Sequence, residues 1–490
     1  MKKLVLLLLF PVLAYGQVQI GQDINGEAPN DQSGRSISLS ANGTIVAIGA
    51  EGNTNENGNL SGHVRVYENL EGTWTQLGQD IDGQAIGNLS GSSVSLSANG
   101  NILAIGARGN DTSGENAGHV RVYENIESTW VQIGQDINGE ASEDFSGRSV
   151  SLSADGTIVA IGADGNDGNG NFSGHVRIYE NQEGTWIQIG QDIDGEALED
   201  RLGSVNNVSL SADGTIVATG ATINDGNGTD SGHVRLFENI EGVWTQIGQD
   251  IDGENSNDQS GNLSLSADGT IVAIGARGNS ENGDSSGHVR VYENLGGTWT
   301  QIGQDIDGQT TEEFFGAGIS LSANGNIVAI SVTANDENAL EFDHVYIYQN
   351  QNGNWVQIGQ AINSGASNFV FGIDISLSSN GDTVALGSFL SDGNGDSSGQ
   401  VRVFDLSDLL SAEEFTTSNF SLYPNPATTQ VTIEIPQEST LERITIYNSL
   451  GQLVLSSKST TINTSTLSQG VYIVEVKTNQ GSYSKKLIVE

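Results

Sequence analysis

The sequence of 490 residues contains no cysteine, five prolines and a single methionine. Without cysteine the chain has no disulfide, no zinc–thiolate site and no cysteine nucleophile, so its stability must come from packing. Lysine is absent between Lys3 and Lys458, and all but five of the 61 acidic residues precede residue 421. The net charge of −43 therefore belongs to residues 17–420. Such a surface repels nucleic acid and anionic lipid, and we expect neither as a partner.

Long hydrophobic runs are also missing after the N-terminus. The first residues combine a basic "MKK", an apolar "LVLLLLFPVL" and a small-residue "AYG". This pattern predicts a signal peptide over residues 1–16, cleaved before Gln17. No later run is long enough to span a bilayer, so we expect no transmembrane segment.

Tryptophan marks an internal repeat in the remaining sequence. Successive tryptophans are separated by 55 to 58 residues, and each interval contains four short runs in which apolar and polar residues alternate. Alternation of period two predicts β-strands, and glycine, asparagine and aspartate between the runs predict turns. The tryptophans are Trp74, Trp130, Trp186, Trp244, Trp299 and Trp355.

Four strands in a unit of this length are typical of a propeller blade. The strand that contains "SLS" occurs seven times, whereas the last unit ends at Phe404 without its fourth strand. A spare copy of that strand, "VQIGQDI", lies at 18–24. The sequence therefore predicts an all-β fold in which residues 17–405 form a seven-bladed β-propeller, with the N-terminal strand closing the last blade.

The loops of this propeller divide into two classes. The 1–2 and 3–4 hairpins are short, whereas the 2–3 loops and the links between blades are long, acidic and variable. In a meander of four strands these two classes lie at opposite ends of the blade. Binding residues usually lie on long loops above a rigid scaffold, so we expect ligand binding at the long-loop face.

The last part of the chain differs in kind. Residues 406–420 are predicted to be a linker, and residues 421–490 contain alternating strands that suit a small Ig-like β-sandwich. The segment contains "YPNP" (423–426), "IYNSLGQLV" (446–454) and "KKLIVE" (485–490). In these motifs it resembles the type A C-terminal sorting domain of the Bacteroidetes type IX secretion system. The resemblance implies the type IX machinery as a partner, transport across the outer membrane, and release or attachment to the cell surface.

The repeats carry a second resemblance. "FG" occurs at 315–316 and 371–372, and "IGA" recurs at the end of the second strand, as at 48–50. In these residues the repeats resemble FG-GAP propellers of the integrin α-chain type. Most copies have "SG" in place of "FG", and the family's calcium loop between strands 1 and 2 is replaced by hairpins such as "SADGT". Calcium is therefore not expected at that hairpin.

All six histidines occupy one position, the start of the third strand, in "SGHVRVYEN" and its copies. Copies in separate blades point outward like spokes and cannot converge on one metal ion. We expect these histidines, and the arginine two residues later, to be structural groups that lock neighbouring blades together. The histidines are His63, His119, His175, His233, His288 and His344.

Three loops of the type "NDGNG" suggest calcium as a possible cofactor. Alternating Asp and Asn with Gly between them is typical of calcium loops, although the same residues also form tight turns without an ion. The candidate ligands are Asp167, Asn169, Asn171, Asp225, Asn227, Asp392, Asn394 and Asp396.

Blades six and seven bring aromatic residues into otherwise polar loops. Phe315, Phe342 and Phe369 are therefore candidate ligand-binding residues, with sequence drift as the alternative. No nucleophile elbow, zinc-binding helix motif or P-loop is present. The favoured function is a secreted or surface-displayed binding or adhesion protein for an unidentified glycan or protein. A polysaccharide lyase or hydrolase, or a passive surface-coat protein, stay open as alternatives.

Overall fold

The computed structural model describes residues 17–333, 344–363, 374–410, 420–435, 440–448, 453–478 and 481–489. The chain divides into two compact units, residues 1–410 and 411–490. Among the described residues, the first unit contains seven sheets and the second contains two. The all-β fold class is confirmed, and the predicted signal peptide lies outside the described residues. None of the described segments forms a helix with the length and hydropathy needed to cross a membrane.

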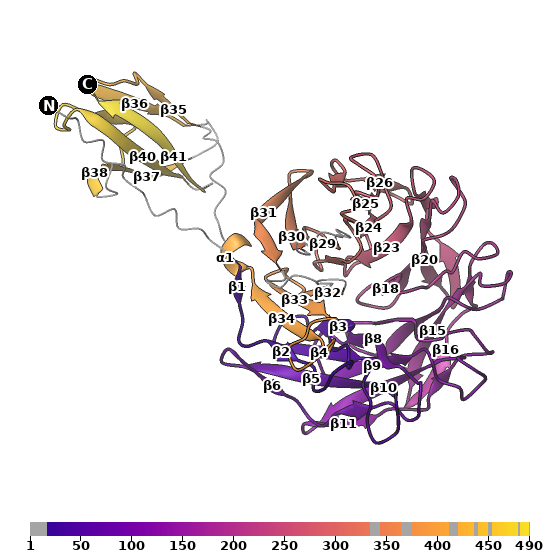
Figure 1. Cartoon of the computed structure of the whole chain (residues 1–490). Helices are drawn as coiled ribbons and strands as arrows, with labels where there is room; N and C mark the ends of the chain where they lie inside the picture. The colour runs from indigo at the N-terminus through magenta and orange to yellow at the C-terminus, as the bar shows by residue number, and fades with distance from the viewer. Residues whose placement is uncertain are drawn as a thin grey trace. The chain divides into compact units, whose positions relative to one another are not determined.

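Each sheet of the first unit is one blade, with its first strand innermost (Figure 1). Blade one contains β3 (Ser36–Leu39), β4 (Ile45–Ala50), β5 (His63–Leu70), β6 (Thr73–Gln76) and β7 (Ile81–Asp82). Blade two contains β8 (Ser90–Leu96), β9 (Ile102–Ala107), β10 (His119–Ile126), β11 (Thr129–Gln132) and β12 (Ile137–Asn138). Blade three contains β13 (Ser149–Leu152), β14 (Ile158–Ala163), β15 (His175–Gln182), β16 (Thr185–Gln188) and β17 (Ile193–Asp194).

The next three blades repeat this arrangement. Blade four contains β18 (Val208–Leu210), β19 (Ile216–Ala221), β20 (His233–Ile240), β21 (Val243–Gln246) and β22 (Ile251–Asp252). Blade five contains β23 (Ser260–Leu265), β24 (Ile271–Ala276), β25 (His288–Asn294), β26 (Trp299–Gln301) and β27 (Ile306–Asp307). Blade six contains β28 (Ile319–Leu321), β29 (Ile327–Val332), β30 (His344–Gln351) and β31 (Asn354–Asn363).

The seventh blade joins the two ends of the propeller sequence. Its strands are β32 (Ile375–Leu377), β33 (Thr383–Ser388), β34 (Gln400–Asp405), β1 (Val18–Gln19) and β2 (Ile24–Asn25). Val18 pairs with Asp405 and Ile24 with Val401, so the N-terminal residues complete this sheet (Figure 1). The predicted closure by residues 18–24 is confirmed. The short helix α1 (Ser407–Leu410) follows β34.

Two rings of hydrogen bonds surround the axis of the propeller. In the first, the amide after each "SLS" strand donates to the equivalent carbonyl of the next blade, from Ala41 to Ala98 and finally from Ser379 back to Ala41, at 2.7–2.9 Å. In the second, the first serine of "SLS" accepts the amide of the leucine in the next blade, as in Leu96 N to Ser38 Oγ at 2.9 Å. The repeated "SLS" is thus explained by contacts between blades, and the ring closes after seven of them.

The fourth strand differs from its prediction in one respect. The run 185–193 was expected to be continuous, but the structure divides it into β16 and β17, which both pair with β15. Gly190 lies between them with φ of 75°, a conformation that glycine adopts without strain. The interruption frees the neighbouring Gln191 to bond to the next blade, where its side chain contacts the backbone of Trp244.

The six tryptophans lie between blades, each about 3% exposed. The Nε1 of Trp186 donates to the Ile133 carbonyl at 2.9 Å, and the Gln135 side chain both donates to and accepts from the Trp186 backbone. Burial of one such ring contributes roughly 3 kcal/mol. The tryptophan and the glutamine of "GQD" therefore act together as a fastening between neighbouring blades.

The second unit is a pair of antiparallel sheets around its own core. One sheet contains β35 (Ser421–Tyr423), β36 (Gln430–Glu434) and β39 (Thr461–Asn463). The other contains β37 (Leu441–Asn448), β38 (Leu453–Ser457), β40 (Gly470–Thr478) and β41 (Gly481–Val489). Val431, Ile444 and Val474 are completely buried in the core that these strands share. This arrangement suits the sandwich predicted for residues 421–490.

Candidate functional site

The long-loop end of the propeller gathers all five of the propeller's arginines that do not belong to third strands. The first strand of each blade begins at this end and the second strand finishes there. By this topology, the residues just before a first strand and just after a second strand lie together around the inner part of the ring. Eleven arginines occur in the propeller, and five occupy such positions: Arg35, Arg108, Arg148, Arg201 and Arg277.

Four of these arginines share two buried carboxylates in what we call the arginine cluster, formed by Arg35, Glu51, Arg108, Arg148, Asp164 and Arg201. Arg35 Nε and Arg108 Nη2 each lie 3.3 Å from a Glu51 oxygen. Arg148 Nε and Arg201 Nη1 each lie 3.9 Å from Asp164 Oδ2. The cluster therefore joins residues from the first three blades and the link to the fourth.

In the arginine cluster the two carboxylates are buried, whereas the four arginines are partly exposed to the solvent. The Glu51 and Asp164 side chains are 9% and 6% exposed, whereas the four arginine side chains are 24–40% exposed. Burial raises the pKa of Asp164, although Arg148 and Arg201 favour its charged form. Burial also lowers the pKa of Arg148, and the nearby charges of Arg108 and Arg35 lower it further.

Chemically, the cluster is a set of fixed hydrogen-bond donors. A guanidinium group has five N–H donors, and the ion pairs to Glu51 and Asp164 leave several of them available in each arginine. Aromatic rings hold two of the four groups, since Arg35 lies 4.8 Å from the Phe389 centroid and Arg201 lies 4.7 Å from the Phe172 centroid. Four cations with two carboxylates have an excess of positive charge, in a unit that is otherwise strongly acidic.

The axial cavity lies at the opposite, short-loop end and has a different chemistry. Its volume is about 190 Å³, and one residue from each "SLS" strand and one from each following turn line it. Its lining consists of seven leucines, six alanines and Ser379. A ring of equivalent apolar residues contains no group for acid–base catalysis.

The six predicted structural histidines lie at the first residue of the third strand in blades one to six, as expected. Five of them, from His63 to His288, are 0–2% exposed. His344 is half-buried and its ring stacks on Tyr346, with centroids 6.1 Å apart. The following arginines bridge blades, since Arg177 Nη1 lies 3.3 Å from Glu140 in the preceding link.

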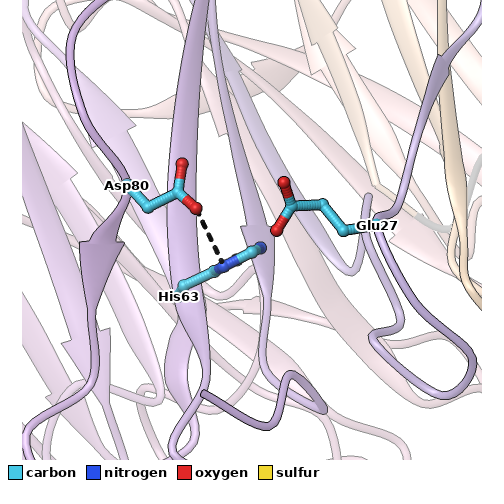
Figure 2. Close-up of side chains that lie close together, drawn as sticks. All are labelled: Glu27, His63 and Asp80. Carbon is cyan, nitrogen blue, oxygen red and sulfur yellow. Dashed lines mark ion pairs between the residues drawn. The ribbon is translucent and has the colours of Figure 1, made fainter. Parts of the chain in front are cut away.

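The structure also shows a grouping around the histidines that the sequence did not reveal. His63 lies between Glu27, from the link that leads into blade one, and Asp80, from between β6 and β7 (Figure 2). One nitrogen or oxygen of each residue lies within 4.8 Å of the others. The four such groups are Glu27/His63/Asp80, Glu140/His175/Asp192, Glu196/His233/Asp250 and Glu254/His288/Asp305. We call them the interface clusters.

Burial keeps the histidines of these clusters neutral. It lowers the pKa of His63 to about 4, with a further lowering by Arg65 and an opposing effect of Asp80. The pKa values of His175, His233 and His288 are also lowered to about 4 for the same first reason. At neutral pH these rings are therefore uncharged and able to offer a nitrogen lone pair.

The candidate calcium ligands form hydrogen bonds within their own loops, which we call the Asx loops, and to the adjoining links. The Oδ1 atoms of Asp167, Asp225 and Asp392 accept backbone amides five residues later, at 2.9 Å. The side chains of Asn169, Asn227 and Asn394 donate to carbonyls of Gly195, Gly253 and Gly26 in the adjoining links. The backbone carbonyls of Asn171 and Asp396 accept amides from the same links. These residues fold the loops, and calcium binding by them stays a prediction.

Of the three candidate aromatic residues, the structure describes Phe315. Phe315 is 1% exposed and packs with Tyr346 and Tyr348, with centroids 6.1 and 6.3 Å away. Its position before Gly316 is filled by Leu202 or serine in blades one to five, so the ring fills core space and leaves no surface for a ligand. Phe342 and Phe369 lie outside the described residues.

Comparison with known proteins identifies the C-terminal segment. Residues 421–490 match the family described as the secretion system C-terminal sorting domain. This segment is a type IX sorting domain. It indicates export of the protein to the cell surface or the extracellular space. No curated protein matches the sequence at a significant level.

Among solved structures, the fold is similar to propeller-like enzymes at low identity. A putative 6-phosphogluconolactonase from Bacteroides uniformis is 13% identical with a TM-score of 0.46, over 70% of this chain and 88% of that one. The periplasmic gluconolactonase of Pseudomonas aeruginosa is 16% identical with a TM-score of 0.46, over 68% and 86%. The GH74 xyloglucanase of Xanthomonas campestris is 9% identical with a TM-score of 0.47, over 79% and 54%. Similarity at this level carries no functional argument.

Proposed function

We propose that the protein is an exported binding protein whose propeller holds a glycan at the arginine cluster. The observation that carries the proposal is the excess of solvent-facing guanidinium groups over two buried carboxylates. Arginine binds carboxylate and sulfate groups through paired hydrogen bonds, and its donors here are held in place by Glu51 and Asp164.

The negative net charge of the whole propeller limits which class of glycan can reach the arginine cluster. Its acidic surface repels a polyanion before that polyanion reaches the cluster. A mainly neutral glycan that carries isolated carboxylate or sulfate groups avoids this repulsion and still offers an anion to Arg108 or Arg201. The ligand class is therefore a neutral polysaccharide or surface glycan with occasional acidic sugars.

The proposal also includes a route of export across both membranes. The signal peptide at residues 1–16 directs the chain through the inner membrane, and the sorting domain engages the type IX machinery at the outer membrane. The protein then acts outside the cell, either released or attached to the surface.

The repeats belong, in our proposal, to the FG-GAP type. Support comes from the two glycines that define it. A Cβ on Gly106 of "IGA" in blade two would lie 2.1 Å from the carbonyl oxygen of Gly147, the "SG" glycine of blade three. Both positions need glycine because neighbouring backbones approach so closely there.

A glycan array with the purified protein tests the binding proposal. We expect retention of glycans with isolated acidic sugars, and no retention of their neutral counterparts. An array without any binding would contradict the proposal and favour a passive surface-coat protein. Shortened products, detected by mass spectrometry after incubation with the retained glycans, would instead favour a polysaccharide lyase or hydrolase.

A further inference from the structure

The interface clusters combine three potential metal ligands from two neighbouring blades. In the fifth blade, Glu254 comes from the link that follows β22 of blade four, whereas His288 begins β25 and Asp305 precedes β27. The same arrangement at His63 is drawn in Figure 2, where the two carboxylates lie on either side of the imidazole. An ion held there would connect consecutive blades.

Both carboxylates of the fifth-blade cluster have a fixed partner. Gln301 donates to Asp305 Oδ1 at 2.5 Å, and Asp305 Oδ2 lies 3.9 Å from His288 Nδ1. Arg290 Nη1 lies 3.2 Å from Glu254 Oε1. Partners of this kind orient the ligands of known metal sites.

The histidine supplies the independent observation that points to a ligand. His288 is completely buried, and neither of its ring nitrogens has a hydrogen-bond partner among the described residues. Its Nδ1 faces Asp305 at 3.9 Å, beyond hydrogen-bond distance. An unpaired buried polar atom costs roughly 1–3 kcal/mol, which an ion bound in this cluster would offset. The Nε2 atoms of His63, His175 and His233 are also unpaired, and so are both nitrogens of His119 in blade two.

We infer that each of the four interface clusters is a binding site for a divalent metal ion of the zinc class. One imidazole nitrogen and two carboxylate oxygens are ligands typical of zinc, and water completes its coordination. Calcium prefers sites built from oxygen alone. The Glu254 side chain is 36% exposed, which gives the ion a path from the solvent and lets the carboxylate close onto it.

The neighbouring charges are compatible with such an ion. The two carboxylates and Arg290 leave one net negative charge beside a neutral imidazole.

The remaining blades provide natural controls. Blade two keeps His119 and Asp136 but has Gln84 at the position of the glutamate. Blade six has Gln309 and Ala361 at the two acidic positions. In blade seven Gln400 replaces the histidine and donates to Asp23 at 3.0 Å. The expected stoichiometry is therefore four ions per chain.

Zinc titration of the purified, chelator-treated protein tests the inference, with bound metal counted by elemental analysis after dialysis. We expect four zinc ions per chain for the unchanged protein. Glu254→Gln should reduce the count to three, and Gln84→Glu should raise it to five by completing the cluster of blade two. Circular dichroism confirms that each variant is folded.

Three results would overturn the inference. They are the absence of bound zinc, a count that neither substitution changes, and binding of calcium in place of zinc, which would favour the Asx loops. Since Glu254 and Gln84 lie outside the arginine cluster, glycan binding by both variants separates this test from that of the proposed function.

Discussion

The Nδ1 atom of His288 lies 3.9 Å from Oδ2 of Asp305, inside a blade interface where the histidine is completely buried. The separation exceeds a hydrogen bond but permits a strong electrostatic interaction. Even so, burial of the ring lowers its pKa more than the Asp305 carboxylate raises it, and the pKa of His288 falls to about 4. In the folded protein the His288 ring therefore stays neutral at pH values well above 4.

This relationship predicts a pH dependence of stability. Between pH 6.5 and pH 4 the unfolded chain binds a proton at His288 that the folded chain does not bind. The contribution of this histidine is therefore complete above pH 6.5 and is lost as the pH falls toward 4. His288→Asn should reduce the slope of unfolding free energy against pH in this window, by up to about 1.4 kcal/mol per pH unit.

Chemical denaturation at several pH values, with chelator present, measures the difference. The comparison with the unchanged protein removes the contributions of the many carboxylates that titrate in the same range. An identical slope in the two proteins would mean that the pKa of His288 is the same in the folded and unfolded states, which would contradict the prediction.

A second prediction concerns the fastening between blades. Gln135→Ala removes both hydrogen bonds to the Trp186 backbone, and we expect a loss of about 2 kcal/mol in unfolding free energy. Gln182→Ala is the matched control, because that side chain is exposed and bonds only within its own strand. It should change the stability by less than about 0.5 kcal/mol. Equal effects of the two substitutions would refute the role given to Gln135.

Much of this propeller could be predicted from its sequence, because every blade repeats the same period and turns. The seven copies of "SLS" and the spare strand at 18–24 were enough to predict the closed ring. The break at Gly190 was missed, since it depends on the bond between Gln191 and the next blade.

The candidate sites were less predictable, for a physical reason. Arg35 and Arg201 are far apart in sequence, and the packing of consecutive blades brings both into the arginine cluster. The interface clusters combine a link, a strand start and a broken strand, so no contiguous motif records them. The members lie in the repeated "DGE" or "NGE", "GHV" and "GQD" segments, but these do not vary together: blade six keeps His344 with Gln309 and Ala361 at the acidic positions, whereas blade seven keeps Asp23 with Gln400 in place of the histidine.

The closing strand yields a third prediction. Residues 18–24 pair with β34, and Ile20 also accepts the Nε1 hydrogen of Trp74. Removing these residues leaves an open edge in blade seven and removes the carbonyl that Trp74 of blade one bonds to. The melting temperature should therefore fall by several degrees. Calorimetry of the truncated and complete proteins measures this. An unchanged melting temperature would show that the ring does not depend on this closure.

The arginine cluster yields the last prediction. Arg108→Gln and Arg201→Gln each remove donors that face the solvent while leaving the buried carboxylates in place. A hydrogen bond to a charged group contributes about 1.5–3 kcal/mol, so binding of an acidic glycan should weaken about 10- to 100-fold. Arg277→Gln is the matched control, since Arg277 lies at the equivalent position of blade five and bonds to Gln259 instead of the cluster.

The most direct measurement of the central claim is titration calorimetry of the array-selected glycan against the unchanged protein, Arg108→Gln and Arg277→Gln. Our account predicts that binding is weakened by Arg108→Gln, is retained by Arg277→Gln, and disappears when the acidic group of the glycan is replaced by a neutral one. Equal affinity in all three proteins, or for the neutral glycan, would contradict it.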